Sequence, residues 1–238
     1  LIAWSDAITS FAMIAHQREK RMAMMFEMAT AFHQLWDQRS NAEPAPDLLS
    51  MMIHSDALGK MDAQEFLGNM ALLIVGGNDT TRNSMSSIPV AFSEFPAEWD
   101  KIKADDSLIP NAASEIIRWQ TPVAHMRRTV VEDTEFRGHK FRQGEKIILW
   151  YISANRDEAI FENAEKFIAD RENARRHIAF GYGVHRCVGA RLAELQIQIL
   201  LSEMAKREMT IQLAGDIVRA DKSFVHGLLN VPVRITNS

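Results

Sequence analysis

The chain has 238 residues, of which 47% are hydrophobic and 24% are charged, a composition typical of a folded globular protein. Its net charge of -4 and the lack of a long basic run argue against nucleic-acid binding. Even the longest apolar runs, such as 70–75, are too short to span a bilayer. A single cysteine excludes an internal disulfide and fits a reducing compartment, so we expect a cytoplasmic protein with no membrane anchor in the residues present.

The first segment already has the pattern of a helix, and it starts at Leu1 without an initiator methionine. No basic region precedes an apolar stretch there, so no secretory signal is expected in these residues. We expect that an N-terminal part of the protein precedes Leu1.

The first half of the chain is predicted to be helical. Apolar residues recur at steps of three and four over 19–38, which predicts an amphipathic helix, and a short helix is expected over 48–53. The run DAQE, residues 62–65, has the form of a capping box that starts a long helix, expected to end near Ser87, ahead of Pro89. Two further helices are expected over 96–105 and 111–120.

The second half combines short strands with one strong helix. The runs 129–131, 136–141 and 146–150 are rich in strand-forming residues and are punctuated by Gly138 and Gly144. A long helix is predicted over 188–207, and short strands are expected in the tail, 210–235. No repeat or linker divides the chain, so we predict a single, mainly α domain with small β-sheets over residues 1–238.

The long central helix contains an unusual interruption. Residues 71–85 read ALLIVGGNDTTRNSM, in which apolar residues are followed by poor helix formers. Each interior glycine costs about 1 kcal/mol relative to alanine. A polar patch facing solvent is one interpretation, but the apolar run leads directly into it, which favours a buried site at this point.

The single cysteine lies in a glycine-rich stretch, FGYGVHRCVGARLAELQ, residues 180–196. Gly181, Gly183 and Gly189 bracket Cys187 at the entrance of the long helix. Backbone N–H groups and the helix dipole favour an anion at such an entrance, and a thiolate held there can ligate a soft or borderline metal. The alternative is a buried structural cysteine in a glycine-rich turn.

Three motifs, in the same order and at similar separations, resemble the cytochrome P-450 family. GGNDTT resembles the oxygen-activating helix motif of that family, EIIR at 115–118 resembles its buried Glu-x-x-R pair, and the cysteine stretch resembles its haem-ligand loop. The matching loop positions are Phe180, Gly181, Gly183, His185, Cys187, Gly189 and Ala193. One motif alone is weak, because E-x-x-R arises by chance as a surface pair. The resemblance covers essentially the whole chain and implies the C-terminal portion of a cytochrome P-450 fold with haem b as cofactor.

The resemblance implies a role for each matching residue. Cys187 would be the axial iron ligand, and a thiolate ligand favours O–O cleavage. His185 and Arg128 would serve the haem propionates, with the neighbouring Arg127 as the alternative. Gly76 and Gly77 would leave room for the haem. Phe180 and Gly181 of the ligand loop would be further haem contacts. Asp79 and Thr80 would deliver protons during oxygen activation, and Glu115, Arg118 and Arg171 would form a buried, structural ion-pair network.

The same resemblance places three segments against the substrate. The substrate contacts it assigns are Leu72, Val75, Val123, Met126 and Phe224. These side chains are apolar, so they suit an apolar substrate, although each is as well explained as core packing. His125 and His226 are exceptions, and alternation along a strand can turn either of them away.

A finer resemblance connects LLIVGGNDTTRNSM and AHMRRT with bacterial P-450 enzymes that hydroxylate medium-chain alkanes at the terminal carbon. It implies a monooxygenase that uses O2 and takes electrons from a ferredoxin and its NAD(P)H-dependent reductase. Basic residues near the thiolate side, Arg186 and Arg191 among them, would receive an acidic ferredoxin, or are ordinary solvated charges. Two alternatives stay open: a haem-binding or structural helical fragment without turnover, and a peroxide-driven hydroxylase of the same fold.

Overall fold

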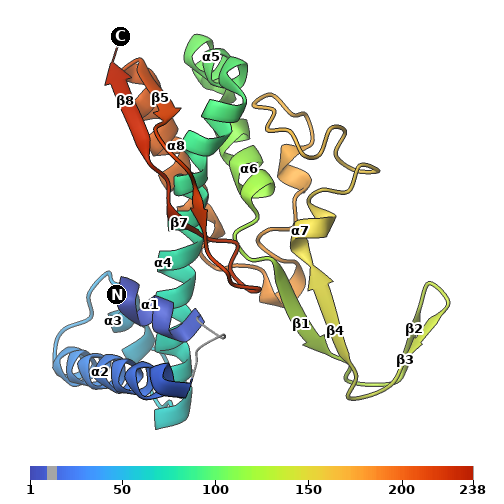
Figure 1. Cartoon of the computed structure of the whole chain (residues 1–238). Coiled ribbons are helices and arrows are strands. Elements are labelled where there is room, and N and C mark those ends of the chain that lie inside the picture. The colour runs from blue at the N-terminus through green and yellow to red at the C-terminus, as the bar shows by residue number, and fades with distance from the viewer. Residues whose placement is uncertain (10–14, 238) are drawn as a thin grey trace. The chain divides into compact units, whose positions relative to one another are not determined.

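The longest helix among the described residues of the computed structural model is α4 (Ala63–Glu94), labelled in Figure 1. The structure describes residues 1–9 and 15–237. It divides into two compact units, Leu1–Asp79 and Thr80–Ser238, whose boundary falls inside α4. The described chain is mainly helical with small sheets, which confirms the predicted fold class. A single domain over the whole chain stays a prediction.

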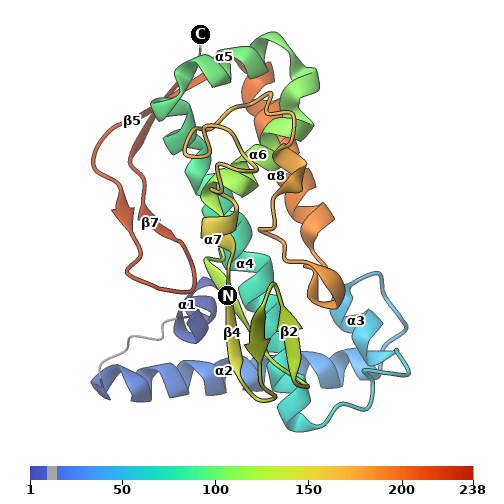
Figure 2. The ribbon, with the colours of Figure 1, turned by 90° about the vertical axis from the view of Figure 1, so that its right-hand side faces the viewer.

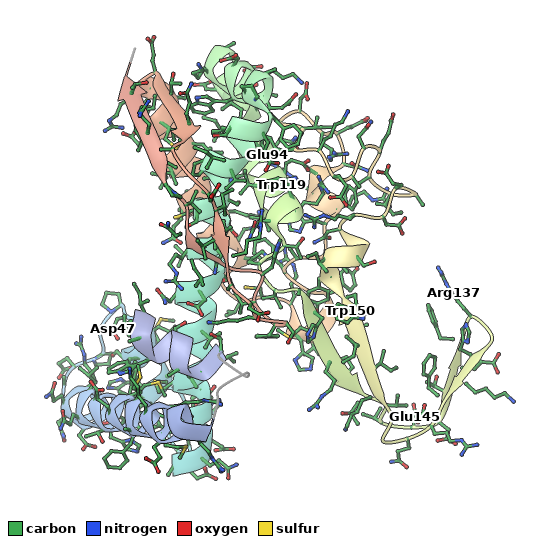
Figure 3. The ribbon with its side chains drawn as sticks, viewed as in Figure 1. Asp47, Glu94, Trp119, Arg137, Glu145 and Trp150 are labelled. Atoms are coloured by element: carbon green, nitrogen blue, oxygen red, sulfur yellow. The ribbon has the colours of Figure 1, made fainter. Side chains whose placement is uncertain are left out.

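The first unit consists of helices around a small core. It contains α1 (Ile2–Thr9), α2 (Ala15–Ser40), α3 (Leu48–Ile53) and the first part of α4. Its buried core residues are Met52, Phe66 and Met70. The side chain of Asp47 caps α3, because its carboxylate accepts the backbone N–H of Ser50 at 2.9 Å; Figure 3 labels this residue.

The capping box at the start of α4 is confirmed. Asp62 Oδ1 accepts the backbone N–H groups of Gln64 and Glu65 at 2.8 and 2.9 Å. Glu65 Oε2 in turn accepts the backbone N–H of Asp62 at 3.3 Å. These reciprocal bonds satisfy donors that the first turn of a helix leaves free, which fixes where α4 begins.

The second unit packs three helices against the rest of α4. These are α5 (Pro96–Ala104), α6 (Ile109–Gln120) and α8 (Ala190–Lys206). Figure 2 shows α6 lying beside α8, and the two helices are in contact. Short helical turns complete this unit: η1 (Asp106–Leu108), α7 (Tyr151–Ala154), η2 (Ala174–Arg176) and η3 (Gly183–His185). The core between the helices includes Ile88, Phe92, Ile116, Ile197 and Leu201, all nearly inaccessible to solvent.

The described residues form four two-stranded antiparallel sheets, all in the second unit. The pairs are β1 (His125–Thr129) with β4 (Lys146–Trp150), β2 (Thr134–Phe136) with β3 (His139–Phe141), β5 (Met209–Leu213) with β8 (Val233–Asn237), and β6 (Val218–Arg219) with β7 (Leu228–Asn230). Arg128 lies opposite Ile147 in the first pair. Trp150, labelled in Figure 3, ends β4.

The predicted end of the long helix near Ser87 is wrong. The helix continues through Pro89 to Glu94, although an interior proline removes a hydrogen bond and costs about 3 kcal/mol. Ile88, Val90, Ala91 and Phe92 are all buried in the core. Their burial offsets the cost of the proline, and the sequence around Pro89 gives no local sign of that packing.

The strand boundaries also differ from prediction. The first strand covers 125–129, not 129–131, although Val130 still exchanges backbone hydrogen bonds with the 144–145 turn. The predicted run 136–141 is part of a hairpin that spans 134–141. Arg137 and Gly138 form its turn, and both adopt positive φ (52° and 79°), as a tight two-residue turn requires.

The helix after the cysteine begins at Ala190, two residues later than predicted, with Gly189 at its N-cap. Its buried residues are Ala190, Ile197, Leu201 and Met204, whereas Leu192, Leu195 and Ile199 are exposed. No helix among the described residues is long and apolar enough to cross a membrane.

Candidate functional site

Backbone hydrogen bonds hold the loop around Cys187 in a closed turn. The N–H of Cys187 donates to the carbonyl of Phe180 at 2.8 Å, and that of Arg186 donates to Gly183 at 3.0 Å. The N–H of Gly181 donates to Ile178 at 2.8 Å. The cysteine's own N–H is therefore used within the loop. The loop fixes the backbone of Cys187 without using its sulfur.

Two glycines are required by the shape of this loop. Gly181 and Gly183 have φ values of 70° and 73°, which side-chain-bearing residues rarely adopt. A Cβ at Gly181 would also lie 3.1 Å from the hydroxyl of Tyr151, which belongs to α7. Backbone conformation therefore explains both glycines, and the close approach of Tyr151 is a second reason for glycine at position 181.

Cys187 is exposed, so the interpretation as a buried structural cysteine is wrong. Its neighbours Val184 and Val188 are 96% and 97% exposed, and His185 is exposed as well. Among the described residues, no group of three or more His, Cys, Asp or Glu side chains gathers as a metal site. A single thiol with Val184, His185, Arg186 and Val188 beside it fits a haem, which needs a protein ligand for its iron, an apolar surface and polar partners for its propionates.

Glu115, Arg118 and Arg171 form a buried network. Arg118 Nε lies 2.7 Å from Glu115 Oε2, and Arg118 Nη2 lies 2.8 Å from Glu115 Oε1. Arg171 Nε donates to the same Oε1 at 2.8 Å. Glu115 and Arg118 have no exposed surface. One carboxylate faces two guanidinium groups, so the network keeps one net positive charge. Hydrogen bonds from the guanidinium groups to backbone carbonyls stabilise that charge inside the core.

The guanidinium groups also hold a long irregular segment in place. Arg118 donates to the carbonyls of Asn155, Ala164 and Lys166 at 2.7, 2.8 and 3.0 Å. Arg171 donates to the carbonyl of Glu162 at 2.6 Å. The segment 155–171 has little regular structure of its own, so these bonds satisfy carbonyls that would otherwise be buried without partners.

Asn155 is a structural residue that sequence reasoning missed. It is fully buried; its side-chain amide donates to Thr121 Oγ1 at 2.9 Å, and its Oδ1 accepts the N–H of Ile178 at 2.8 Å. It therefore joins the end of α6 to the segment leading into the cysteine loop. From the sequence, an isolated asparagine after a predicted strand indicates a turn. No local pattern distinguishes such a turn residue from a buried structural asparagine.

His177 is a second missed residue, ten positions before the cysteine. Its Nδ1 accepts the N–H of Ala179 at 3.2 Å, and its ring contacts that of Phe180. Burial, with the positive charges of Arg118 and Arg186, lowers the pKa of His177 to about 4. The neutral ring suits this position, because a protonated Nδ1 would no longer accept the hydrogen bond.

The two adjacent arginines of β1 differ in environment. Arg127 is exposed, whereas Arg128 is half-buried. Arg128 Nη1 donates to the carbonyl of Arg127 at 3.0 Å, which orients its side chain. Alternation along the strand therefore separates the two cations, as expected for a strand with two different faces.

Two of the three predicted substrate segments meet in the second unit. Val123 and Val225 form an isolated β-bridge, and the N–H of Ala124 donates to the carbonyl of Phe224 at 2.9 Å. His125 contacts the rings of Phe224 and Trp150. Val123, Met126 and Phe224 are half-buried.

His226 is turned toward the protein. Its Nδ1 lies 2.7 Å from the carbonyl of Gln120, and since a carbonyl only accepts, Nδ1 carries the proton. Gln120 Nε2 donates back to the carbonyl of His226 at 2.7 Å. Burial lowers the pKa of His226. These bonds favour the alternative in which the His226 side chain turns away from a substrate.

The central motif of α4 is helical throughout. Leu72 is 69% exposed and Val75 is half-buried, so this stretch is less buried than its composition suggests. A Cβ at Gly76 or Gly77 would meet no neighbouring atom within 4 Å, so packing within the described chain does not require glycine at either position. Asp79 is buried, Thr80 is half-buried, and the hydroxyl of Ser84 donates to the carbonyl of Thr80 at 3.0 Å.

Comparison with known proteins identifies the class to which this fold and this loop belong. The sequence model of the cytochrome P-450 family matches residues 107–228, which include the Glu-x-x-R pair and the cysteine loop. The chain therefore belongs to the cytochrome P-450 family, whose members bind haem b.

Individual relatives support the same assignment. Linalool 8-monooxygenase of Pseudomonas putida is 39% identical over 201 residues, covering 84% of this chain and 49% of that protein. A methyl-branched lipid omega-hydroxylase of Mycobacterium tuberculosis is 37% identical over 190 residues, covering 79% of this chain and 44% of that protein.

Among solved structures, cytochrome P-450-153 from Novosphingobium aromaticivorans superposes with a TM-score of 0.93 at 52% identity. CYP153D17 from Sphingomonas sp. PAMC 26605 superposes with a TM-score of 0.91 at 54% identity. This chain is covered to 99% and 98%, and those chains to 58% and 59%. The chain thus spans about half the length of these curated relatives and under two thirds of these solved chains.

Proposed function

We propose that the full-length protein is a haem-thiolate monooxygenase that inserts one oxygen atom of O2 into a C–H bond of an apolar substrate, at the terminal carbon of medium-chain alkanes. The observation that carries the proposal is Cys187, an exposed thiol on a loop whose backbone is fixed by its own hydrogen bonds. Haem, when bound, supplies the activation of dioxygen, and the protein supplies binding, orientation and protons.

The residues that would hold the haem lie at three places in the chain. Cys187 would hold the haem iron through its thiolate, on a loop in which Phe180 and Gly181 set the backbone. His185 and Arg128 would donate hydrogen bonds to the propionates. Gly76 and Gly77 let a flat ligand approach the backbone of α4 closely, which explains two glycines that the packing of the described chain does not require.

Asp79 and Thr80 would hold and pass protons while oxygen is reduced. They provide a carboxyl and a hydroxyl at successive positions of α4, and general acid catalysis needs such groups close to the reacting atoms. A peroxide-driven enzyme does not need this pair, so its presence favours the use of O2. The electrons would come from a ferredoxin and its NAD(P)H-dependent reductase, with the exposed Arg186 and Arg191 as contacts for an acidic partner.

The substrate class follows from apolar side chains and from the relatives. Leu72, Val75, Val123, Met126 and Phe224 are the proposed contacts, and none of them offers a cation to a carboxylate. Two relatives are named for an 8-monooxygenase and an omega-hydroxylase activity, and two solved relatives belong to the 153 group of the family. A cytoplasmic location is part of the proposal, from the single cysteine.

Titration of the full-length protein with linear alkanes and with the matching fatty acids tests the substrate class. Each buried methylene contributes about 0.8 kcal/mol, so affinity for alkanes should rise about fourfold per carbon until the pocket is full. Analysis of the products should find hydroxyl chiefly at the terminal carbon. Tighter binding of the fatty acids, or chiefly internal hydroxylation, would contradict the alkane proposal and leave the monooxygenase proposal standing.

A further inference from the structure

The carboxyl group of Asp79 has a different partner at each oxygen within the first unit. Asn78 Nδ2 donates to Oδ1 at 3.3 Å. The hydroxyl of Thr9, at the end of α1, lies 3.4 Å from Oδ2. Asp79 and Thr9 are only 1% and 2% exposed, so these contacts are shielded from bulk water. A residue that is distant in sequence thus reaches the acid of the oxygen-activating motif.

The two partners differ in what they can do. The side-chain nitrogen of Asn78 only donates, so Oδ1 stays an acceptor. The hydroxyl of Thr9 can donate or accept, and it also lies 3.0 Å from the carbonyl of Ser5, one turn earlier in α1. Its single proton therefore has two acceptors within reach, Asp79 Oδ2 and the Ser5 carbonyl.

These contacts satisfy Asp79 in both of its protonation states. When the carboxyl is ionised, the Thr9 hydroxyl donates to Oδ2. When a proton arrives on Oδ2, that O–H donates to Thr9 Oγ1, and the hydroxyl of Thr9 turns to donate to the Ser5 carbonyl. One proton has been added to Asp79 and none has left Thr9, and Asp79 Oδ2 and the Thr9 hydroxyl stay hydrogen-bonded to each other in both states.

We propose that Thr9 is a positioning residue for Asp79, which keeps the exchangeable proton on Oδ2 and stabilises the carboxyl before and after proton transfer. This inference rests on the proposed function, in which Asp79 passes protons to the site where oxygen is reduced. Thr9 acts through Asp79 and contacts no reacting atom.

α1 also provides a matched control. The Oγ of Ser5 is buried and has no hydrogen-bond partner among the described residues. Ser5→Ala therefore removes a buried hydroxyl from the same helix but leaves the contact between Thr9 and Asp79 in place. Thr9→Val removes the hydroxyl at nearly constant volume, and Thr9→Ser restores it.

The first measurement uses the full-length protein at rest. The difference between the infrared spectra of the wild type and of Asp79→Asn identifies the band of the Asp79 carboxyl. We expect Thr9→Val to shift that band, and Thr9→Ser and Ser5→Ala to leave it in place. An unshifted band in Thr9→Val would overturn the inference.

The second measurement is product formed per NAD(P)H consumed by the full-length protein with its redox partners. Thr9→Val should lower this ratio about fivefold, the factor expected for one net hydrogen bond, and Thr9→Ser should restore it. If Asp79→Asn uncouples the enzyme and Thr9→Val does not, only the role of Thr9 is overturned. If Asp79→Asn itself stays fully coupled, the proposed proton role of Asp79 fails, and the role of Thr9 fails with it.

Discussion

Arg118 holds both carboxylate oxygens of Glu115, with Nε 2.7 Å from Oε2 and Nη2 2.8 Å from Oε1, at a place with no solvent exposure. Since the same guanidinium donates to three backbone carbonyls between residues 155 and 166, one ion pair organises the segment that precedes the cysteine loop. Loss of the negative charge would leave Arg118 and Arg171 buried without their anion.

Glu115→Gln should therefore lower the free energy of unfolding by about 3–5 kcal/mol, the usual cost of breaking a buried pair by removing one partner. Denaturant titration of the full-length protein measures this loss. Lys206→Ala, which breaks the exposed pair of Lys206 with Glu203, is the control and should behave as the wild type. Equal stability of Glu115→Gln and the wild type would show that the network is not needed for folding.

The sequence predicts part of this network and not the rest. The spacing of Glu115 and Arg118 places them on one face of a helix, and the family resemblance adds Arg171. The carbonyl partners lie in an irregular segment whose path depends on packing against α6, so no local pattern indicates them. Asn155 was missed for the same reason, because its role comes from contacts with Thr121 and Ile178 far along the chain.

The sequence predicts where helices form better than it predicts which side chains are buried. Alternation along β1 correctly suggests that Arg127 and Arg128 differ, but it does not give the partner of either. The continuation of α4 through Pro89 depends on burial of the following residues, whereas local propensity favours an end before the proline.

Stability should depend on pH through His177. Its pKa of about 4 in the folded protein lies below the ordinary value of 6.5, so the unfolded chain takes up a proton first as the pH falls. Stability should therefore fall between about pH 6.5 and pH 4 by up to about 3 kcal/mol from this residue alone.

The free energy of unfolding of the full-length protein, measured across this pH range, tests the contribution of His177. His177→Asn keeps an acceptor and does not titrate, so it should lose less stability than the wild type as the pH falls. His139→Asn, at an exposed position of β3, is the matched control. Parallel pH profiles for His177→Asn and the wild type would refute the assignment.

The neighbouring arginines of β1 provide a paired test of haem binding. Arg128→Gln should weaken haem binding by about tenfold to a hundredfold, since a hydrogen bond to a charged group is worth about 1.5–3 kcal/mol. Arg127→Gln should bind haem as the wild type does, because Arg127 is exposed. Haem retention by the full-length variants during competition with a haem acceptor measures both. A larger loss in Arg127→Gln would reverse the assignment.

Thr80 should control the yield of product per electron. In Thr80→Ala of the full-length protein, NAD(P)H consumption should continue while product falls at least about tenfold and peroxide rises, because a proton donor has been removed. Thr81→Ala, one position further along α4, is the control and should stay coupled. An unchanged product yield in Thr80→Ala would exclude Thr80 from proton delivery.

The central claim is that Cys187 binds the haem iron as a thiolate, and the absorption spectrum of the reduced carbon monoxide complex of the full-length protein tests it most directly. The wild type should show the red-shifted band of a thiolate-ligated haem. Cys187→Ala should lose that band, and so should Cys187→His, which keeps a side chain able to ligate iron. A thiolate band that persists in either variant, or that is missing from the wild type with haem bound, would contradict the account.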